Sequence, residues 1–322
     1  MMKAAIRRNY GPLDDLKIET LEKPVAKDNE VLVKVHATTV SRTDYVVLTG
    51  RPFIIRFFTG LLKPSFPVPG TDFAGIIESV GKSVKSFKVN DRVFGFNDQG
   101  LASQAEYMVF PENGAMSRIP DNMPFEQAAA SIEGAHYAIN FINKVKFKAG
   151  DKILINGATG AIGSALLQFM KYHNTYVTAV CNTRNLELIK ALGADRIYDY
   201  TREDFTEDEE KYDFVFDAAG KSTFSDCKPL LKKGGAYISS ELGPGGQNLF
   251  LPLTTKMFGS RKVLFPFPFD IKGSINFIKD LYEKGKFKPV IDRKYPLEDI
   301  REAYRYVASG QKTGNVVLSL EN

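Results

Sequence analysis

Cysteine, histidine and tryptophan are scarce in this chain of 322 residues, which has two cysteines, three histidines and no tryptophan. Two cysteines, Cys181 and Cys227, cannot build a disulfide framework or a four-cysteine metal site. No apolar run approaches the length of a membrane span, and residues 1–11 lack the apolar core of a signal peptide. The net charge of +5 is mild, and the basic residues are mixed with acidic ones, so nucleic-acid binding is not expected. We expect a cytoplasmic protein with reduced thiols.

The first third of the chain has the pattern of β structure. Residues 30–37 alternate between apolar and polar with period two, as do shorter runs at 75–80 and 92–96. Glycine and proline interrupt these runs, notably at residues 66–70. This pattern predicts a compact, partly open β-barrel.

Beyond residue 122 the pattern changes to helices alternating with strands. Residues 123–144 have helical spacing, and the chain then alternates short apolar strands with apolar-periodic helices, which predicts βαβ units and a parallel sheet. The tail adds two helices and a closing strand. The expected strands are 152–155, 176–180, 196–200, 213–217, 235–239 and 315–320, and the expected helices are 161–172, 185–192, 223–231, 275–284 and 297–309.

A glycine-rich turn, Asn156-Gly157-Ala158-Thr159-Gly160-Ala161-Ile162-Gly163, lies between the expected strand 152–155 and the expected helix 161–172. Backbone N–H groups at a helix N-terminus favour an anion. Gly160 would let the backbone approach a pyrophosphate, and Gly163 would let the helix pack closely on the strand. The alternative is a tight turn that needs glycine only for its backbone angles.

About 20 residues later, where a dinucleotide fold selects its cofactor, the chain reads Cys181-Asn182-Thr183-Arg184. No carboxylate stands in this stretch to bind the ribose hydroxyls of NAD, whereas the Arg184 guanidinium could pair with a 2′-phosphate. This favours NADP(H), unless Arg184 is a solvated residue of the helix that follows.

Several fragments in a fixed order resemble the medium-chain dehydrogenase/reductase superfamily, and within it the zinc-independent quinone oxidoreductase branch. The fragments lie at residues 70–81, 91–95, 156–163, 192–195, 213–220 and 314–318. The resemblance implies an α/β chain with a GroES-like, partly open β-barrel catalytic domain and a Rossmann domain with a doubly wound parallel sheet. The first would comprise residues 1–122 and 262–322, and the second residues 123–261. In this branch the phosphate turn commonly begins with alanine, as at Ala158.

The resemblance and the expected strand ends together indicate the residues of the cofactor site. Besides the residues of the turn and of the second strand end, they include a tyrosine near the adenosine phosphate, residues ending the fourth and fifth strands, and a lysine before the last strand. The expected cofactor-binding residues are Ala158, Thr159, Gly160, Ala161, Ile162, Gly163, Cys181, Asn182, Thr183, Arg184, Tyr200, Ala218, Gly220, Ser239, Ser240 and Lys312.

The ligands of catalytic zinc in related alcohol dehydrogenases are replaced here. Ser41 stands in place of a cysteine, and Thr71-Asp72 stand in place of a His-Glu pair. Zinc needs thiolate or imidazole donors, so no metal site is expected. His36, His136 and His173 are expected to be structural or solvated.

Candidate catalytic residues are few. The resemblance places Ser41 and Asp44 near the nicotinamide, although Asp44 could instead cap a helix that begins at Tyr45. In the resemblance, either Tyr137 replaces a threonine of the relatives or the match slips by one residue. Tyr137 could donate a proton to a carbonyl oxygen, oriented by Glu133. The alternative for Tyr137 is a partly buried side chain satisfied by the backbone.

Without zinc, the chemistry that remains is hydride transfer from NADPH to a quinone or to the β-carbon of an α,β-unsaturated carbonyl. We expect a small hydrophobic carbonyl or quinone substrate and a homodimer formed through the edges of the Rossmann sheets. The rivals are a zinc-dependent alcohol dehydrogenase and a non-catalytic NADPH-binding sensor. The apolar insert at 51–66 could be a lid, a short core helix or a patch buried between subunits, and residues 265–269 an inter-domain or dimer strand.

Overall fold

The computed structural model describes residues 1–98 and 100–320, and the chain forms two compact units. Unit 1 consists of Met1–Glu133, Ile271–Glu283 and Lys288–Asn322, of which Gln99, Glu321 and Asn322 lie outside the described residues; unit 2 consists of Gly134–Asp270 and Lys284–Phe287. No helix within the described residues is long and apolar enough to cross a membrane.

Unit 1 is built on a curved β-sheet. Its seven-stranded sheet has the order β14-β15-β3-β4-β5-β7, with β6 also pairing with β3, and β1 pairs with β2 in a separate hairpin. The last strand, β15, pairs antiparallel with β3, so the C-terminal tail completes the sheet of the N-terminal segment, as the resemblance implied. The strands are β1 (Met2–Ile6), β2 (Lys17–Leu21), β3 (Glu30–Val40), β4 (Asp72–Val80), β5 (Arg92–Phe96), β6 (Tyr107–Pro111), β7 (Met116–Arg118), β14 (Ile291–Pro296) and β15 (Asn315–Ser319).

Five helices belong to unit 1. The amphipathic helix α10 buries Ile300, Tyr304 and Val307 against Leu48 of α1 and Val316 of β15, because its apolar residues recur at the spacing of one helix face. A second apolar cluster, which includes Val33, Phe73 and Phe110, fills the inside of the sheet. The helices are α1 (Arg42–Thr49), α2 (Arg56–Thr59), α3 (Phe125–Ala130), α9 (Ile271–Glu283) and α10 (Ile300–Ala308).

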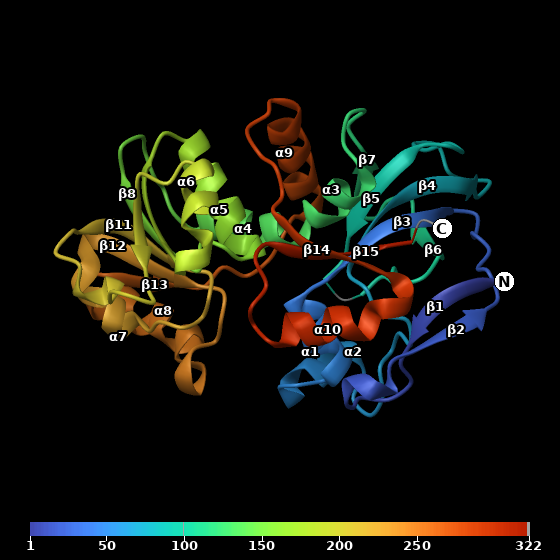
Figure 1. The fold of residues 1–322 in the computed structure, drawn as a ribbon, viewed down its shortest axis with the longest axis horizontal. Helices are drawn as coiled ribbons and strands as arrows, with labels where there is room; N and C mark the ends of the chain where they lie inside the picture. Colours follow the sequence, from blue (N-terminus) through green and yellow to red (C-terminus); the bar gives the residue numbers. More distant parts are fainter. Residues whose placement is uncertain (99, 321–322) are drawn as a thin grey trace. The chain divides into compact units, whose positions relative to one another are not determined.

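Unit 2 is a doubly wound sheet of six parallel strands in the order β10-β9-β8-β11-β12-β13. Counted from β8, this is the 3-2-1-4-5-6 order of a dinucleotide-binding fold, whose strand order reverses between the first and the fourth strand. Helices cover both faces of the sheet, α5 and α6 on one face and α7 and α8 on the other (Figure 1). The elements are α4 (Glu133–Ile142), β8 (Lys152–Asn156), α5 (Ala161–Tyr172), β9 (Tyr176–Cys181), α6 (Leu186–Ala191), β10 (Arg196–Asp199), β11 (Tyr212–Asp217), α7 (Phe224–Cys227), β12 (Leu231–Ser239), α8 (Gln247–Phe258) and β13 (Lys262–Leu264).

The compact units divide the chain at different residues from the predicted domains. Residues 123–133 pack with unit 1, where the His36 ring stacks on Phe125 with 4.4 Å between centroids. Residues 262–270 remain with unit 2, because β13 pairs with β12 as the last strand of the parallel sheet. The sequence pattern changes after residue 122, where helices begin, whereas the chain passes from unit 1 to unit 2 only after Glu133.

One local prediction was wrong and one is refined. Residues 123–144, for which helical spacing was predicted, form two helices, α3 and α4; α3 ends at Ala130, and the hydroxyl of its C-cap residue Ser131 donates to the carbonyl of Ala128. Residues 265–269 do not form a strand, and β13 ends at Leu264. Pro266 and Pro268 have no N–H group to donate to a neighbouring strand.

Candidate dinucleotide site and buried acidic cluster

The turn between β8 and α5 leaves the N-terminus of α5 without a side-chain cap. Gly157, directly after β8, has a φ of +79°, which favours glycine. Gly160 is the N-cap residue of α5 and provides no side-chain acceptor for the first amides of the helix. Thr159, Ala161 and Ile162 are partly exposed around it. The free N–H groups of a helix N-terminus suit an anion such as a phosphate.

Gly163 and Gly160 of this turn differ in whether the fold requires glycine at their position. A Cβ on Gly163 would lie 2.1 Å from the carbonyl oxygen of Gly157, so Gly163 is required for the close packing of α5 on the turn. At Gly160 the nearest atom to an added Cβ, again the Gly157 oxygen, is 3.7 Å away, and the φ of −71° is open to any residue. The fold therefore does not require glycine at 160. The space that a side chain would fill lies beside the helix N-terminus.

Ala158 differs from its neighbours in the turn. It is fully buried, and its N–H donates to the carbonyl of Val180 in β9 at 3.1 Å. Ala158 thus fixes the turn to β9, and its amide is already engaged.

At the end of β9 the structure adds a carboxylate that sequence reasoning missed. The parallel pairing sets Asp199, the last residue of β10, beside Cys181. Asp199 accepts hydrogen bonds from the Thr183 hydroxyl and, at 2.7 Å, from the Thr201 hydroxyl, and the former is the main reason why its pKa is lowered. Arg202 lies 3.5 Å from the same carboxylate. Residues 181–184 themselves contain no carboxylate, but the neighbouring strand β10 places one beside them.

The remaining predicted residues at this strand end are placed unevenly. Arg184 and Tyr200 are exposed, Asn182 is partly buried, and the N–H of Tyr200 donates to the carbonyl of Cys181 at 3.0 Å. Cys181 is buried, and burial raises the pKa of its thiol to about 11, so it is an inert packing residue.

Asp217, the last residue of β11, organises the neighbouring strand ends. Its carboxylate accepts hydrogen bonds from Asn156 at 3.1 Å, from the N–H of Gly220 at 2.9 Å and from the Tyr237 hydroxyl at 2.9 Å. The Ser239 hydroxyl also donates to it, at 3.4 Å. These bonds hold the ends of β8, β11 and β12 in one arrangement. The sequence indicates Ala218, Gly220, Ser239 and Ser240 at this edge but not Asp217, whose carboxylate accepts hydrogen bonds from Gly220 and Ser239.

In unit 1, Ser41 and Asp44 form the capping box of α1. The Ser41 hydroxyl accepts from the N–H of Asp44 at 2.9 Å, and the Asp44 carboxylate accepts from the N–H of Ser41 at 2.9 Å. The N-cap is therefore Ser41 rather than Asp44, and α1 begins at Arg42 rather than at Tyr45. The second oxygen of Asp44, Oδ1, is buried without a hydrogen-bond partner.

Three carboxyl groups lie together in the interior of unit 1: Asp44, Asp72 and Glu133. Burial, followed by the charges of Glu133 and Asp72, raises the pKa of Asp44 well above its ordinary value. Burial and the charge of Glu133 raise the pKa of Asp72 to about 7, against hydrogen bonds from Thr39 and Thr38. Burial also raises the pKa of Glu133. Burial therefore shifts all three carboxyl groups towards their protonated forms.

Two cations lie near this cluster. Burial lowers the pKa of Lys312, and the charge of Glu133 opposes that shift; its ammonium donates to the carbonyl of Gly314 at 2.6 Å. Burial also lowers the pKa of Arg7 to about 10, partly offset by Tyr304, Tyr10 and Asp44. Lys312 was predicted to bind the cofactor phosphate, and the structure gives it a charged partner within unit 1.

Tyr137 lies one turn after Glu133 in α4 and is partly buried. Its ring is 5.7 Å from that of His136. His136 is buried and within 3.3 Å of the Asn140 amide, and burial lowers its pKa to about 4. This histidine is therefore neutral and structural, as predicted.

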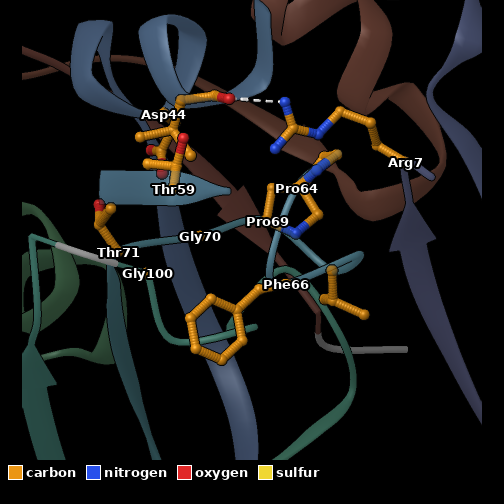
Figure 2. Close-up of a pocket in the computed structure, with 11 residues that line it drawn as sticks. Arg7, Asp44, Thr59, Pro64, Phe66, Pro69, Gly70, Thr71 and Gly100 are labelled. Atoms are coloured by element: carbon orange, nitrogen blue, oxygen red, sulfur yellow. Dashed lines mark hydrogen bonds between the residues drawn. The ribbon is translucent and has the colours of Figure 1, made fainter. Parts of the chain in front are cut away.

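A small cavity of about 20 Å³ reaches Asp44 from the side of the 51–70 segment. Figure 2 shows Arg7, Asp44, Thr59, Phe66 and Thr71 around it. Asp44 Oδ1, Thr71 Oγ1 and Arg7 Nε are buried polar atoms of its lining that have no protein partner. The volume suits one water molecule, which could satisfy these atoms.

The residues at the positions of zinc ligands in alcohol dehydrogenases do not fit zinc. Ser41 is engaged in the capping box, and Asp72 accepts the N–H of Thr39 at 2.7 Å. Within the described residues no group of three or more histidine, cysteine, aspartate or glutamate side chains could hold a metal ion. Both cysteines are buried in unit 2.

Comparison with known proteins agrees with this geometry. The model of the alcohol dehydrogenase GroES-like domain matches residues 27–121, and that of a zinc-binding dehydrogenase domain matches residues 192–318. The chain is 33% identical to the chloroplastic quinone-oxidoreductase QR1 of Triphysaria versicolor, covering 99% of this chain and 98% of the relative. It is 31% identical to the chloroplastic NADPH-dependent alkenal/one oxidoreductase of Arabidopsis thaliana, covering 98% of this chain and 79% of the relative.

A solved structure gives the same result. The quinone oxidoreductase of Coxiella burnetii superposes with a TM-score of 0.88 and 25% identity, over 99% of each chain. Its likeness extends over both units, the GroES-like one and the Rossmann one. The chain belongs to the medium-chain dehydrogenase/reductase superfamily, in its quinone oxidoreductase-like branch of oxidoreductases.

Proposed function

We propose that the protein is a zinc-independent, NADPH-dependent reductase that transfers hydride to a quinone or to the β-carbon of an α,β-unsaturated carbonyl. The observation that carries the proposal is the uncapped N-terminus of α5, where Gly160 leaves room that the fold itself does not need. It lies at the carboxyl end of β8, beside the point where the strand order reverses. The printed names of two relatives, a quinone-oxidoreductase and an NADPH-dependent alkenal/one oxidoreductase, support the acceptor class.

The choice of NADP(H) over NAD rests on the end of β9. Asp199 is an acid that the structure brings there, and two threonine hydroxyls donate to its carboxylate. Arg184 and Arg202 have exposed guanidinium groups in the same region. A 2′-phosphate would therefore meet cations at the surface and a carboxylate that is already hydrogen-bonded. Tyr200, exposed at the end of β10, is proposed to pack near the adenosine.

The chemistry of the donors supports the proposed zinc independence. Hydroxyl and carboxyl groups replace thiolate and imidazole at Ser41, Thr71 and Asp72, and Ser41 and Asp72 are held by other partners. Hydride removal from a saturated alcohol requires loss of its hydroxyl proton, which a bound metal ion promotes. A conjugated acceptor is already activated, so it requires mainly orientation and a proton.

The bound nicotinamide would supply the hydride. The chain would supply binding through the α5 turn and a local store of protons in the cluster of Asp44, Asp72 and Glu133. We assign Ser41 to holding Asp44 in its orientation and Tyr137 to protonating the acceptor oxygen. We further propose that unit 1 is the catalytic domain and unit 2 the dinucleotide-binding domain of a homodimer. The cytoplasmic location expected from the sequence stays a prediction, since the relatives named above are chloroplastic.

Three measurements on the purified protein test the proposal. Titration should quench or enhance the fluorescence of NADPH with saturation, and with weaker binding of NADH. A panel of 1,2-naphthoquinone, 2-alkenals and cyclic enones should show turnover, whereas saturated alcohols with NADP⁺ should not. Elemental analysis should find no stoichiometric zinc. Binding without turnover of any acceptor would favour a sensor, and stoichiometric zinc with alcohol oxidation would favour an alcohol dehydrogenase.

A further inference from the structure

The segment of residues 51–66, here called the aromatic loop, exposes many large apolar side chains. It comprises a 3₁₀ turn at Phe53–Ile55, the short helix α2 and the chain up to Phe66. Phe58 is 74% exposed and Leu62 is 88% exposed. Contiguous exposed apolar surface of this kind marks interaction sites in proteins. The exposed large apolar residues of the loop are Phe53, Ile54, Phe57, Phe58, Leu61, Leu62 and Phe66.

Polar contacts on the inner side of the loop hold these residues outward. The hydroxyl of Tyr10 donates to the carbonyl of Gly60 at 2.7 Å and lies 2.7 Å from the Thr59 hydroxyl. Arg56 donates to the carbonyl of Gly50 at 3.1 Å and stacks over the Tyr10 ring. These contacts keep the apolar side chains of the loop exposed. The alternative that residues 51–66 form a short core helix is therefore excluded.

The apolar side chains of residues 53–62 also do not line the cavity beside Asp44. From the loop, that cavity is lined by Thr59, Pro64 and Phe66 (Figure 2). A lid would direct its apolar residues towards the space that it covers. The exposed apolar residues from Phe53 to Leu62 are not among the residues that line it.

The charge around the loop has one sign. No acidic residue occurs between Asp44 and Asp72, whereas Arg51, Arg56 and Lys63 lie within the loop. Arg51 and Lys63 are exposed at its two ends. Aromatic and leucine side chains flanked by basic residues are the composition of segments that lie in the interface of an anionic bilayer.

A second copy of the chain would be a poor partner for this face. In a two-fold dimer the same patch contacts itself, so Arg51 and Lys63 would approach the same cations with no acid in the loop to pair with them. Anionic lipid headgroups provide the complementary charge, and the acyl boundary accepts the phenylalanine and leucine side chains.

We propose that the aromatic loop docks the protein on the surface of an anionic lipid bilayer. Phe57, Phe58, Leu61 and Leu62 enter the headgroup boundary, and Arg51 and Lys63 contact lipid phosphates. No helix in the described part of the chain is long and apolar enough to cross the bilayer. Binding itself is independent of the function proposed above, although a membrane location would give a lipophilic quinone acceptor direct access to the enzyme.

The test is co-sedimentation of the full chain with phosphatidylcholine vesicles that contain or lack phosphatidylglycerol, without cofactor or acceptor. We expect binding to the anionic vesicles that weakens with added salt, and little binding to phosphatidylcholine alone. The double variant Phe57→Ser/Phe58→Ser should reduce the partition coefficient at least tenfold, and Arg51→Glu/Lys63→Glu should abolish the preference for anionic lipid. Val25→Ser, which removes an 85% exposed apolar side chain elsewhere in unit 1, should change nothing.

Two other occupants predict different results. If the loop joins two copies, Phe57→Ser/Phe58→Ser will lower the sedimentation mass without lipid, and vesicle binding of the wild type will be absent. If it is a lid, the variant will raise the KM for the acceptor, again without vesicle binding. Either result overturns the proposal. Urea denaturation of each variant verifies folding without cofactor, so loss of vesicle binding is separable from failure of the proposed reductase function.

Discussion

The carbonyl oxygen of Gly157 lies where a side chain on Gly163 would have to begin, since a Cβ at Gly163 would be 2.1 Å from it. Three residues earlier, at Gly160, an added Cβ would meet nothing closer than 3.7 Å. Packing therefore requires glycine at position 163 but not at position 160. Only the second leaves space for a ligand.

Gly160→Asp should separate folding from cofactor binding. Aspartate is a favoured N-cap residue, and the backbone at 160 is already extended, with φ of −71° and ψ of 172°. The free energy of unfolding should therefore stay unchanged or rise by about 0.5 kcal/mol. A carboxylate at the phosphate position should weaken NADPH binding by roughly a hundredfold, about 2.7 kcal/mol.

Gly160→Asn is the matched control, because it fills the same space without the charge and should weaken binding less than Gly160→Asp. Gly163→Ala should instead destabilise the fold by about 1–3 kcal/mol through overlap with the Gly157 oxygen. Urea denaturation and fluorescence titration measure the two effects. Unchanged NADPH affinity in Gly160→Asp would remove this turn from the cofactor site.

The parts of the fold that the sequence predicts well are local. The turn from β8 into α5 is recognisable because strand, glycines and helix follow one another within a few residues, and α5 spans Ala161–Tyr172 as predicted. Its glycines have distinct physical roles that a sequence pattern can express. The closing strand, too, begins at Asn315, where its own residues predict it.

The parts that the sequence misses depend on register and on distant neighbours. Asp199 lies beside Cys181 only because β10 pairs with β9 in that register. Asp44, Asp72 and Glu133 come from α1, β4 and α4, and their raised pKa values arise from mutual burial. Neither relationship can be recognised from any short stretch of the sequence.

The stability of unit 1 should depend on pH through Asp72. Its pKa rises from 3.8 to about 7 on folding, so between these values the folded chain holds a proton that the unfolded chain has lost. Folding stability contributed by this group is therefore complete below pH 3.8 and falls as the pH rises to about 7. Relative to Asp72→Asn, the wild type should lose stability over this window with a slope of at most about 1.4 kcal/mol per pH unit.

Asp199→Asn is the control of opposite sign. The pKa of Asp199 is lowered, chiefly by the Thr183 hydroxyl, so its stabilising contribution is present above pH 3.8 and is lost only in stronger acid. Urea denaturation at a series of pH values would compare both variants with the wild type. A flat difference for Asp72→Asn from pH 4 to 7 would show that burial does not keep this carboxyl protonated.

The cofactor preference should depend on Arg184. Replacing it by aspartate places a negative charge where the proposed 2′-phosphate binds, so the ratio of kcat/KM for NADPH over NADH should fall at least tenfold, about 1.4 kcal/mol. The affinity for NADH should change little. Lys190→Asp makes a similar charge change at an exposed position later in α6 and should leave the ratio intact. An unaltered ratio in Arg184→Asp would assign the phosphate to other residues, with Arg202 the next candidate.

Tyr137 is the residue on which the proton step of the proposed reaction depends. If its hydroxyl protonates the acceptor oxygen, Tyr137→Phe should lower kcat by roughly a hundredfold, the lower range for a general acid, while the dissociation constant of NADPH stays the same. The loss should be larger for an enone, whose enolate must be protonated, than for a quinone, whose reduced form is a weaker base. The pH profile of kcat should also lose the ionisation that the Tyr137 hydroxyl contributes in the wild type. Tyr176→Phe removes a hydroxyl from another partly exposed tyrosine, on β9, and serves as the matched control. Unchanged kcat in Tyr137→Phe, with a lower free energy of unfolding, would instead make Tyr137 a packing residue of α4 and leave the proton to come from the buried acids or from water.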